Sequence, residues 1–325
     1  MLFHQVGSPA RAALIACLLC VVGATVSAQS WPNKPLKLIV PYAPAGGTDV
    51  LARNLAQKLT EALGQPVVVE NRAGADGMIG SEFAARAPAD GYTMLIASSS
   101  HAINPTLYAK INFNTVKDFS CITQTAKQQV ILVVHPSLPV NNVRELIQYA
   151  KANPGTLNFA SPSKATQLPM ELFNTMAGIK MTNVPYKGSA PALTDMLAGR
   201  IQAGFGGGAS VAPHIKTGRL RALAVGDDRR SSFMPDLPTV AESGLPDFHS
   251  VVWTGMFVPS ATPRAIVNRL NEEVVRIMTS PDFKSKLEGQ GFEPVASAPE
   301  RCDGFIATEI TKWAKVAKDA GIQPE

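Results

Sequence analysis

A glycine pair stands between a strand-like and a helix-like segment early in the chain. The stretch PYAPAGGTD follows the apolar run LKLIV and precedes VLARNLAQKLTEALG. The first amides of a helix have no intrahelical partner and lie at the positive end of the helix dipole, so such a turn binds anions readily. Gly46 and Gly47 let the backbone approach a ligand, and Thr48 or Asp49 can cap the helix. For this motif alone, a tight connection that binds nothing is an equally good interpretation.

Three further turns of the same kind favour binding. Their glycines and polar residues are Gly74, Gly77, Gly80, Ser161, Ser163, Lys164, Thr166, Gln167, Lys187, Gly188 and Ser189. In open α/β sheets, ligands bind beyond the carboxyl ends of the strands. We therefore expect these turns to converge on one cleft that holds a small anion.

Motifs for catalysis, metal binding and nucleotide cofactors are weak in this sequence. The glycines from Gly74 to Gly80 are spaced differently from the dinucleotide fingerprint, and neither GxxxxGK[ST] nor GxSxG occurs. The histidines at 101, 135, 214 and 249 lack the HxxxH or HExxH spacing of metal ligands. We therefore expect no catalytic residue, no metal and no cofactor. A secreted hydrolase or isomerase is the less favoured alternative, because it requires a nucleophile with its base, or a metal.

Strand-like runs alternate with helix-period segments, which indicates an α/β fold with a mostly parallel sheet. Strands are predicted at 36–40, 66–71, 92–97, 130–136, 157–161, 182–186, 201–207 and 221–226. Helices are predicted at 50–63, 79–86, 142–152, 168–176 and 190–198. The stretch after residue 97 is predicted as a loop. From Trp253 onward the pattern predicts helices only, at 263–279, 281–290 and 299–320.

The C-terminal helices have apolar faces that must pack on another part of the chain. The most economical path crosses to a second domain near Lys127 and returns near Val251. We therefore predict domain 1 at 29–126 plus 252–325 and domain 2 at 127–251, with a hinged cleft between them.

The N-terminal segment resembles a secretory signal. Arg11 precedes an uncharged apolar run over 12–26 that ends on Val-Ser-Ala, which predicts a signal peptide over 1–28 and a periplasmic protein. A lipid anchor at Cys17 is an open alternative. Only Cys121 and Cys302 follow this segment, and the sequence leaves open whether they pair.

Charge gives no sign of a polyanionic partner. The chain has 30 Lys and Arg against 25 Asp and Glu, and removal of the signal, which carries Arg11, leaves a net charge of +4. The basic residues are scattered without a run, as on an ordinary solvated surface. We expect no nucleic-acid partner and no membrane span.

Many ordered stretches from about Trp31 to the C-terminus resemble one known family. They are PYAPAGGTD with the following LAR, VVVENRAGADGMIG, APADGYTMLIAS, NVPYKGSAPALTDMLAGRI, APHIKTGRLRALAV, LPTVAESG and KWAKVAKDAGI. The chain resembles the Bug family of periplasmic solute-binding receptors, which is related to tripartite tricarboxylate transporters. This resemblance implies a two-domain α/β fold of the periplasmic binding protein type, a Venus flytrap similar to type II.

The resemblance also implies how a ligand is held. Family members bind a small carboxylate between the first two turns of domain 1, here 42–49 and 74–78, through backbone amides and ordered water. Domain 2 closes on it with the turns that match 161–167 and 187–190. The predicted ligand-binding residues are Tyr42, Ala45, Gly46, Gly47, Thr48, Gly74, Gly77, Met78, Ser98, Ser161, Ser163, Lys164, Thr166, Gln167, Lys187, Gly188, Ala190 and Gly206.

Different members of this set have different expected roles. Backbone amides are expected to donate from Ala45, Gly46, Gly47, Gly74 and Gly77. Polar or water-bridged contacts are expected from Ser98, Ser161, Ser163 and Thr166. Tyr42 should pack against the ligand's edge, and Asp49 is better interpreted as a helix cap than as a ligand group.

The second domain departs from the family pattern in its charges. Gln167 stands where a histidine is common, Lys164 adds a cation, and Gly206 with Gly207 replaces an Asp-Asn pair. An added cation and a lost carboxylate favour a more anionic ligand, such as a dicarboxylate or an aromatic acid. The alternative is that Lys164 points into solvent, as most lysines do.

These interpretations combine into one predicted function. The chain is expected to be a monomeric, non-catalytic extracytoplasmic receptor for a small carboxylate, whether a dicarboxylate, an amino acid or an aromatic acid. It would deliver this ligand to the subunits of a membrane transporter. A ligand sensor for a membrane signalling partner requires the same binding chemistry and stays open as an alternative.

Overall fold

The structure is a computed structural model that describes residues 31–325 apart from 163, 187 and 232–233. The predicted signal peptide and lipid anchor, together with Ser163 and Lys187, lie outside the described residues. The chain divides into two compact units, Met1–Asn33 and Lys34–Glu325, and the following account concerns the second.

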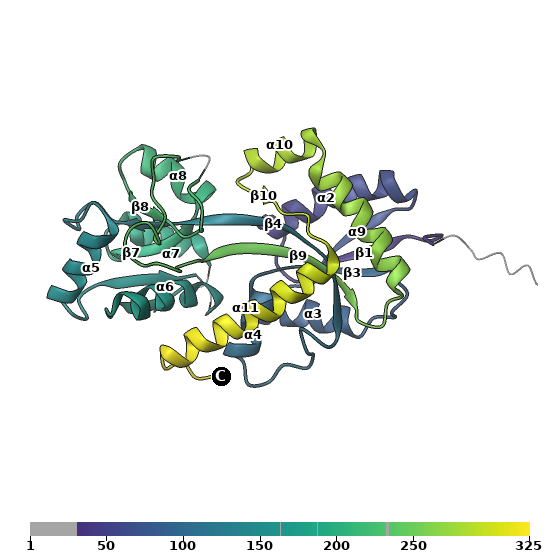
Figure 1. Cartoon of the computed structure of the whole chain (residues 1–325), viewed down its shortest axis with the longest axis horizontal. Coiled ribbons are helices and arrows are strands. Elements are labelled where there is room, and N and C mark those ends of the chain that lie inside the picture. The colour runs from purple at the N-terminus through teal and green to yellow at the C-terminus, as the bar shows by residue number, and fades with distance from the viewer. Residues whose placement is uncertain (1–30, 163, 187, 232–233) are drawn as a thin grey trace, which may run out of the picture. The chain divides into compact units, whose positions relative to one another are not determined.

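The first part of this unit, which we call lobe 1, begins with alternating parallel strands and helices (Figure 1). Its strands are β1 (Leu36–Val40), β2 (Val67–Asn71) and β3 (Thr93–Ser98), with β1 central and parallel to both neighbours. Its helices are α2 (Gly47–Leu63), the 3₁₀ turn η1 (Ala75–Gly77), α3 (Met78–Ala85) and α4 (Ser100–Leu107). The predicted alternation is confirmed, but the loop expected after β3 is wrong, because α4 occupies it.

Two long antiparallel strands connect lobe 1 to the rest of the unit. They are β4 (Phe119–Val134) and β9 (Val251–Pro259), and their pairing runs from Phe119 opposite Pro259 to Gln129 opposite Val251. We call this pair the β4–β9 ribbon. The strand predicted to begin at residue 130 therefore begins eleven residues earlier, at Phe119. The prediction that only helices follow Trp253 is wrong, because β9 continues to Pro259. The proposed domain boundaries fall inside this ribbon.

The second part, lobe 2, repeats the α/β pattern beyond the ribbon. Its strands are β5 (Asn158–Ser161), β6 (Thr182–Pro185), β7 (Ala203–Gly207) and β8 (Arg221–Val225). Its helices are α5 (Val143–Ala152), α6 (Lys164–Ala177), α7 (Ser189–Leu197) and α8 (Gly208–Lys216). Strand β5 is parallel to β6 and β7, whereas β7 and β8 pair antiparallel to β4. The main strand path is β2-β1-β3-β9-β4-β7-β5-β6, and β8 pairs with β4 off this path.

The C-terminal segment returns to lobe 1 and covers it. It contains α9 (Arg264–Thr279), α10 (Pro281–Gly289), the short strand β10 (Glu293–Pro294) paired with β4, and α11 (Pro299–Asp319). Cys121 of β4 and Cys302 of α11 form a disulfide across 181 residues of sequence. This answers the question of pairing that the sequence left open.

The last helix also contacts both lobes. Trp313 and Val316 of α11 pack with Ile103 and Leu107 of α4 and with Leu168 of α6, and all five side chains are buried. Figure 1 shows α11 lying along α4 and extending toward α6. The apolar faces predicted for the C-terminal helices are thus covered within the unit.

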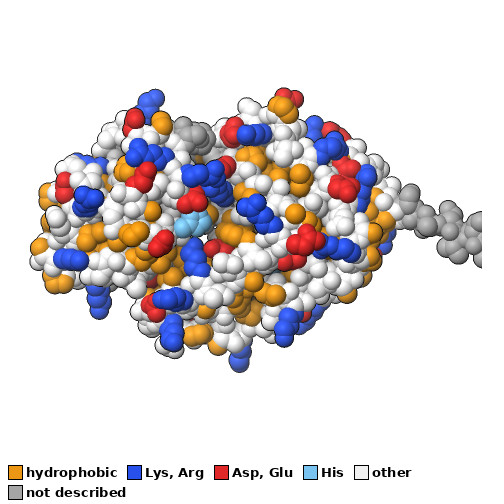
Figure 2. Space-filling model, in the orientation of Figure 1, with side chains coloured by type: hydrophobic (Ala, Val, Ile, Leu, Met, Phe, Trp, Pro, Cys, Tyr) orange, Lys and Arg blue, Asp and Glu red, His pale blue; other side chains and the backbone are white. Residues whose placement is uncertain are grey.

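The surface drawn in Figure 2 carries interspersed Lys, Arg, Asp and Glu side chains rather than a field of one sign. Among the described residues, no helix combines the length and the apolar character needed to cross a bilayer.

Candidate functional site

The glycine turn between β1 and α2 has the predicted strand-to-helix geometry. Gly46 is the N-cap residue of α2, so Thr48 and Asp49, which the sequence suggested as caps, lie within the first turn instead. The amides of Gly47 and Thr48 lie in the first helical turn, where no preceding carbonyl is in reach within the helix. A Cβ on Gly47 would lie 3.3 Å from Cζ of Phe292, so a larger residue would displace that ring.

The Asp49 carboxylate stabilises this turn by hydrogen bonds within the protein. Its Oδ2 accepts hydrogen bonds from the Ala45 amide at 2.9 Å and from Nε of Arg53 at 3.0 Å, and its Oδ1 accepts from Asn71 at 2.8 Å. Burial is the largest influence on the carboxyl and opposes ionisation, yet the bonds from Arg53, Ala45 and Asn71 together lower the pKa of Asp49. The Ala45 amide was expected to donate to a ligand, but here it donates to Asp49.

Three hydroxyl groups meet beside this turn. The Tyr42 oxygen accepts from the Ser98 amide at 3.0 Å and from Ser98 Oγ at 2.8 Å, and it lies 2.8 Å from Ser100 Oγ. Burial raises the pKa of Tyr42 and outweighs the hydrogen bonds from both serines. Tyr42 therefore stays a neutral hydroxyl, and its ring is fixed against the end of β3.

The second glycine turn is built differently from the first. The Gly77 amide donates to the Gly74 carbonyl at 3.0 Å, and the Met78 amide donates to the Ala75 carbonyl. The expected Gly77 amide donor is thus engaged by the turn itself. Gly77 has a φ of 92°, and a Cβ there would lie 2.9 Å from the Tyr42 ring. This glycine is required for backbone conformation and for packing against Tyr42.

One cavity of about 240 Å³ opens at the start of α2. It is lined by Tyr42, Gly46, Gly47, Thr48, Ser98, Ala126, Gln128, Val252, Thr254 and Phe292. The first five belong to the predicted set, and the last five were missed. Ala126 and Gln128 are two residues apart on β4, and Val252 and Thr254 are two residues apart on β9. Because side chains two apart on a strand lie on the same side, each pair projects to one face of the ribbon.

The cavity lining combines apolar side chains with neutral polar groups. Among the residues described, it includes no Lys, Arg, His, Asp or Glu side chain. An anion in this cavity would therefore be held by amides, hydroxyls and a carboxamide, aided by the positive end of α2. A larger hollow of about 390 Å³ lies between α2, α9 and α10, and it contains none of the predicted residues.

The predicted residues of lobe 2 are found at other sites of the structure. Ser161 Oγ donates to Asn183 at 2.6 Å, and Gln167 donates to Glu171 at 3.1 Å. The Gly188 amide donates to the Pro162 carbonyl at 3.0 Å. Thr166 lies in the first turn of α6 and Ala190 in the first turn of α7. None of these five is in the lining of the described cavity.

Two other predicted lobe 2 residues require separate comment. Gly206 lies in β7 opposite Ile131, and a Cβ there would be 2.3 Å from Cγ1 of Val211. Packing of α8 on β7 thus accounts for this glycine without a ligand. Lys164 begins α6, but its side chain is not among those described, so its proposed role stays a prediction.

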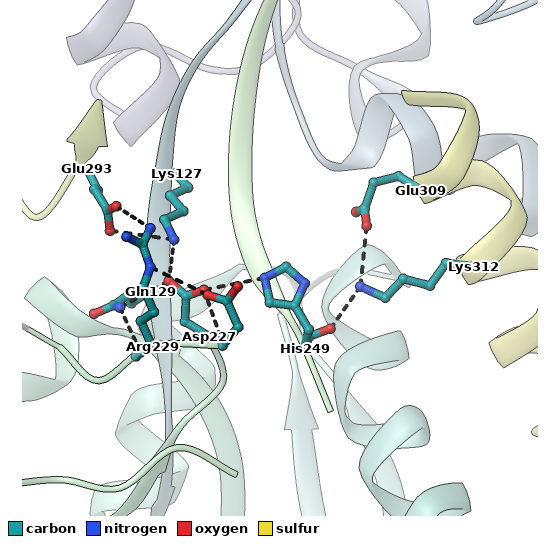
Figure 3. A network of polar contacts seen from close by, with 9 residues as sticks. Lys127, Gln129, Asp227, Arg229, His249, Glu293, Glu309 and Lys312 are labelled. Atoms are coloured by element: carbon teal, nitrogen blue, oxygen red, sulfur yellow. Dashed lines mark hydrogen bonds and ion pairs between the residues drawn. The ribbon is translucent and has the colours of Figure 1, made fainter. Parts of the chain in front are cut away.

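A buried ionic network holds the opposite face of the ribbon (Figure 3). Lys127 Nζ lies 2.7 Å from Asp227 Oδ2, Gln129 donates to the same oxygen at 3.0 Å, and His249 Nε2 lies 3.4 Å from Oδ1. Burial has the largest effect on the pKa of Asp227 and opposes ionisation of this carboxyl. The hydrogen bonds that it accepts, of which those from His249 and Lys127 contribute most, nevertheless hold its pKa far below the ordinary range.

The same network reaches the C-terminal segment. Glu293 of β10 lies 3.0 Å from Arg229 and 3.6 Å from Lys127, and Lys312 of α11 donates to the His249 carbonyl at 2.8 Å. The backbone from which Gln128 projects is therefore fixed on both sides. Lys127 and Gln129, its neighbours in sequence, both extend toward Asp227 on the far face of β4.

Comparisons with known proteins identify the family. The protein-family model described as "Tripartite tricarboxylate transporter family receptor" matches residues 51–322. Protein BugT of Bordetella pertussis is 39% identical over 304 residues, which span 92% of this chain and 93% of BugT.

Solved structures of similar proteins support the same family assignment. The R. palustris protein Rpa4515 with adipate has a TM-score of 0.80 at 36% identity and covers 91% of this chain and 100% of its own. MatC (Rpa3494) from Rhodopseudomonas palustris with bound malate has a TM-score of 0.75 at 28% identity and covers 88% of this chain and 99% of its own. The predicted periplasmic binding protein fold is thereby confirmed. The chain belongs to the tripartite tricarboxylate transporter receptor family, the TctC or Bug group of periplasmic solute-binding receptors.

Proposed function

We propose that this protein is a non-catalytic receptor that captures a small carboxylate at the start of α2. The observation that carries the proposal is the 240 Å³ cavity, which joins the first turn of α2 to a lining of neutral hydrogen-bonding groups. Two relatives of the same fold are described with adipate and with malate, which supports a carboxylate as the ligand class.

The proposed contacts start with the backbone. A carboxylate oxygen accepts from the amides of Gly47 and Thr48, and the Thr48 hydroxyl adds a third donor. Ordered water bridges the remaining oxygen to the hydroxyl cluster of Tyr42 and Ser98. Because the amides of Ala45, Gly77 and Met78 bond within the protein, they support the turns rather than the ligand.

Closure of the two lobes completes the proposed cycle. The turns at 161–167 and 187–190 would add contacts only in the closed form, and this difference in affinity is what couples binding to closure. We place the domain boundaries at 126/127 and 251/252. Small-angle scattering with and without a bound acid tests this, since an unchanged radius of gyration contradicts closure.

The closed form is proposed to deliver its ligand to membrane transporter subunits from the periplasm, as a monomer exported with a signal peptide cleaved after Ala28. N-terminal sequencing of the secreted protein checks the cleavage site. Uptake of a labelled acid by host cells with and without the gene checks delivery.

Binding itself is tested by replacing Gly47 with valine. A valine would extend beyond the Cβ position that already lies 3.3 Å from Phe292, so it fills the cavity and blocks the α2 amides. We expect wild type to show a rise in melting temperature with at least one member of a panel of mono-, di- and aromatic acids, and Gly47→Val to show none. Gly304→Val is the matched control, because a Cβ at that exposed α11 position meets nothing within 4 Å.

Two results would overturn the proposal. Retained binding in Gly47→Val would place the ligand elsewhere. A product detected by mass spectrometry after incubation with the panel acids would support the enzyme alternative instead.

A further inference from the structure

Gln128 differs from most polar side chains around it, because its carboxamide makes no hydrogen bond within the part of the chain that the structure describes. Tyr42 and Ser98 are bonded to each other, and the Thr254 hydroxyl lies 2.8 Å from Thr125 Oγ1. Among the described residues, no hydrogen bond is recorded for the side chains of Thr48 and Gln128, the other two polar members of the lining. A carboxamide carries both a donor and an acceptor, so a half-buried one without partners offers two unused bonds.

The carboxamide lies next to the first turn of α2. Its Oε1 is 3.9 Å from the position that a Cβ on Gly47 would occupy, and its Nε2 is 4.0 Å from the equivalent position on Gly291. It therefore lies between the proposed carboxylate-binding amides and the turn that precedes β10. A group attached next to the ligand's carboxylate would be within its reach.

The backbone of Gln128 holds this position firmly. Gln128 pairs with Val252 inside the β4–β9 ribbon. On the opposite face, Lys127 and Gln129 are both bonded to Asp227, which is fully buried. A side chain on so constrained a strand can discriminate between ligands, because it does not move away from a ligand that fails to bond it.

We propose that Gln128 is a specificity-determining residue that selects carboxylates with a hydroxyl group on the carbon next to the carboxylate. This inference rests on the proposed function, since it assumes that the carboxylate binds at α2. The ligand hydroxyl donates to Oε1 and accepts from Nε2. A hydroxyl fits better than an ammonium, because the described lining offers no carboxylate to pair with a second charge.

The selectivity follows from the carboxamide that a ligand without the hydroxyl leaves without a hydrogen bond. An acid without the hydroxyl fills the cavity but leaves the carboxamide desolvated and unpaired, which costs about tenfold in affinity. Removing the carboxamide should therefore strengthen the plain acid, which no longer leaves a polar group unpaired, and weaken the hydroxy acid, whose hydroxyl loses its partner.

Matched pairs of acids test this by calorimetry: glycolate with acetate, lactate with propionate, malate with succinate, and mandelate with phenylacetate. We expect wild type to prefer the hydroxy member of any pair that binds by about tenfold. Gln128→Leu should reduce this ratio to about one, because the plain acid gains affinity while the hydroxy acid loses a hydrogen-bond partner. Gln124→Leu, the same change four residues earlier on β4 and outside the lining, is the control and should keep the ratio.

Gln128→Glu provides a second, nearly isosteric variant. Its negative charge should weaken both members of every pair, so unchanged affinities would show that the side chain does not face the ligand. If acids bind to wild type but the ratio survives in Gln128→Leu, Gln128 is not the selective residue and the receptor function stands. If no acid in any pair binds, both proposals fail.

Discussion

Acidification from pH 7 to pH 5 should destabilise the protein through one buried histidine. His101 is 2% exposed and lies among the rings of Phe113, Phe119 and Phe257, with ring centroids 5.8, 5.0 and 4.8 Å away. Its Nδ1 lies 3.4 Å from Ser81 Oγ, and its Nε2 has no partner among the described residues. Burial without a nearby charge lowers the pKa of His101 from 6.5 to about 3.

The sign follows from which state binds the proton first. Because the folded pKa lies below the unfolded one, the unfolded chain takes up the proton as the pH falls through 6.5, while the folded state resists until about pH 3. The contribution that neutral His101 makes to the free energy of unfolding is thus complete above pH 6.5 and is lost progressively as the pH falls below that value. The loss between pH 7 and pH 5 is about 2 kcal/mol.

Urea denaturation at pH 7, 6 and 5 and at constant ionic strength measures this slope. In His101→Phe the free energy of unfolding should fall by about 2 kcal/mol less over the same range than in wild type. The absolute stability of the variant is not the readout, since Ser81 also loses a neighbour. His214→Gln on α8, a partly exposed histidine, is the control and should keep the wild-type slope. Equal slopes in wild type and His101→Phe would refute the reasoning.

Three further predictions concern the ribbon, the disulfide and lobe 2. Asp227→Asn should destabilise the fold by about 3–5 kcal/mol at pH 7, because it leaves the buried Lys127 with only the more distant and more exposed Glu293 as a counter-charge. Since the folded pKa of Asp227 is lowered, the contribution of this carboxylate to stability should decline below its ordinary pKa of 3.8, and a pH-independent loss in denaturant titrations would contradict this. Replacing Cys121 and Cys302 with serine should lower the free energy of unfolding by about 2–5 kcal/mol, as should a reductant on wild type alone, and an unchanged denaturation midpoint would be the contrary outcome. Lys164→Ala should weaken dicarboxylates more than monocarboxylates in calorimetric titration, whereas an unchanged preference would mean that this lysine points into solvent.

Local features of the sequence were enough to predict the first glycine turn. The apolar run ending at Val40, the glycine pair and the following helical period are all contained within a few residues, so their geometry hardly depends on distant contacts. Tyr42, Gly46, Gly47, Thr48 and Ser98 accordingly line one cavity.

The other half of the lining depends on long-range pairing that a single sequence does not reveal. Gln128 and Thr254 face the cavity only because β4 and β9 pair across more than a hundred intervening residues. The β9 segment VVWTGMFVP is apolar apart from Thr254 and Gly255, so its pattern does not distinguish a strand from a buried helix. Ala126 and Gln128 were missed because the strand was expected to begin at Val130.

The amide donors were predicted less well than the turns that contain them. Ala45 and Gly77 stand in the expected loops, but Asp49 and the Gly74 carbonyl accept their N–H groups. A sequence places a glycine without indicating whether the reason for it is a ligand or a neighbouring side chain. Gly77 against Tyr42 and Gly206 against Val211 show the second reason.

The β4–β9 ribbon restricts how the lobes can move. Its pairing continues from Phe119 to Gln129, with irregularities between Cys121 and Thr123 and between Gln124 and Ala126. Sliding one strand along the other would break every rung of this ladder, whereas twisting or bending it keeps most of them. A relative motion of the lobes that keeps this pairing would therefore be a rotation whose axis passes close to the ribbon. Since Gln128 projects from the ribbon itself, a guest in contact with it would lie near that axis and be displaced little, while the helices at the far ends of the lobes swing through the largest arcs.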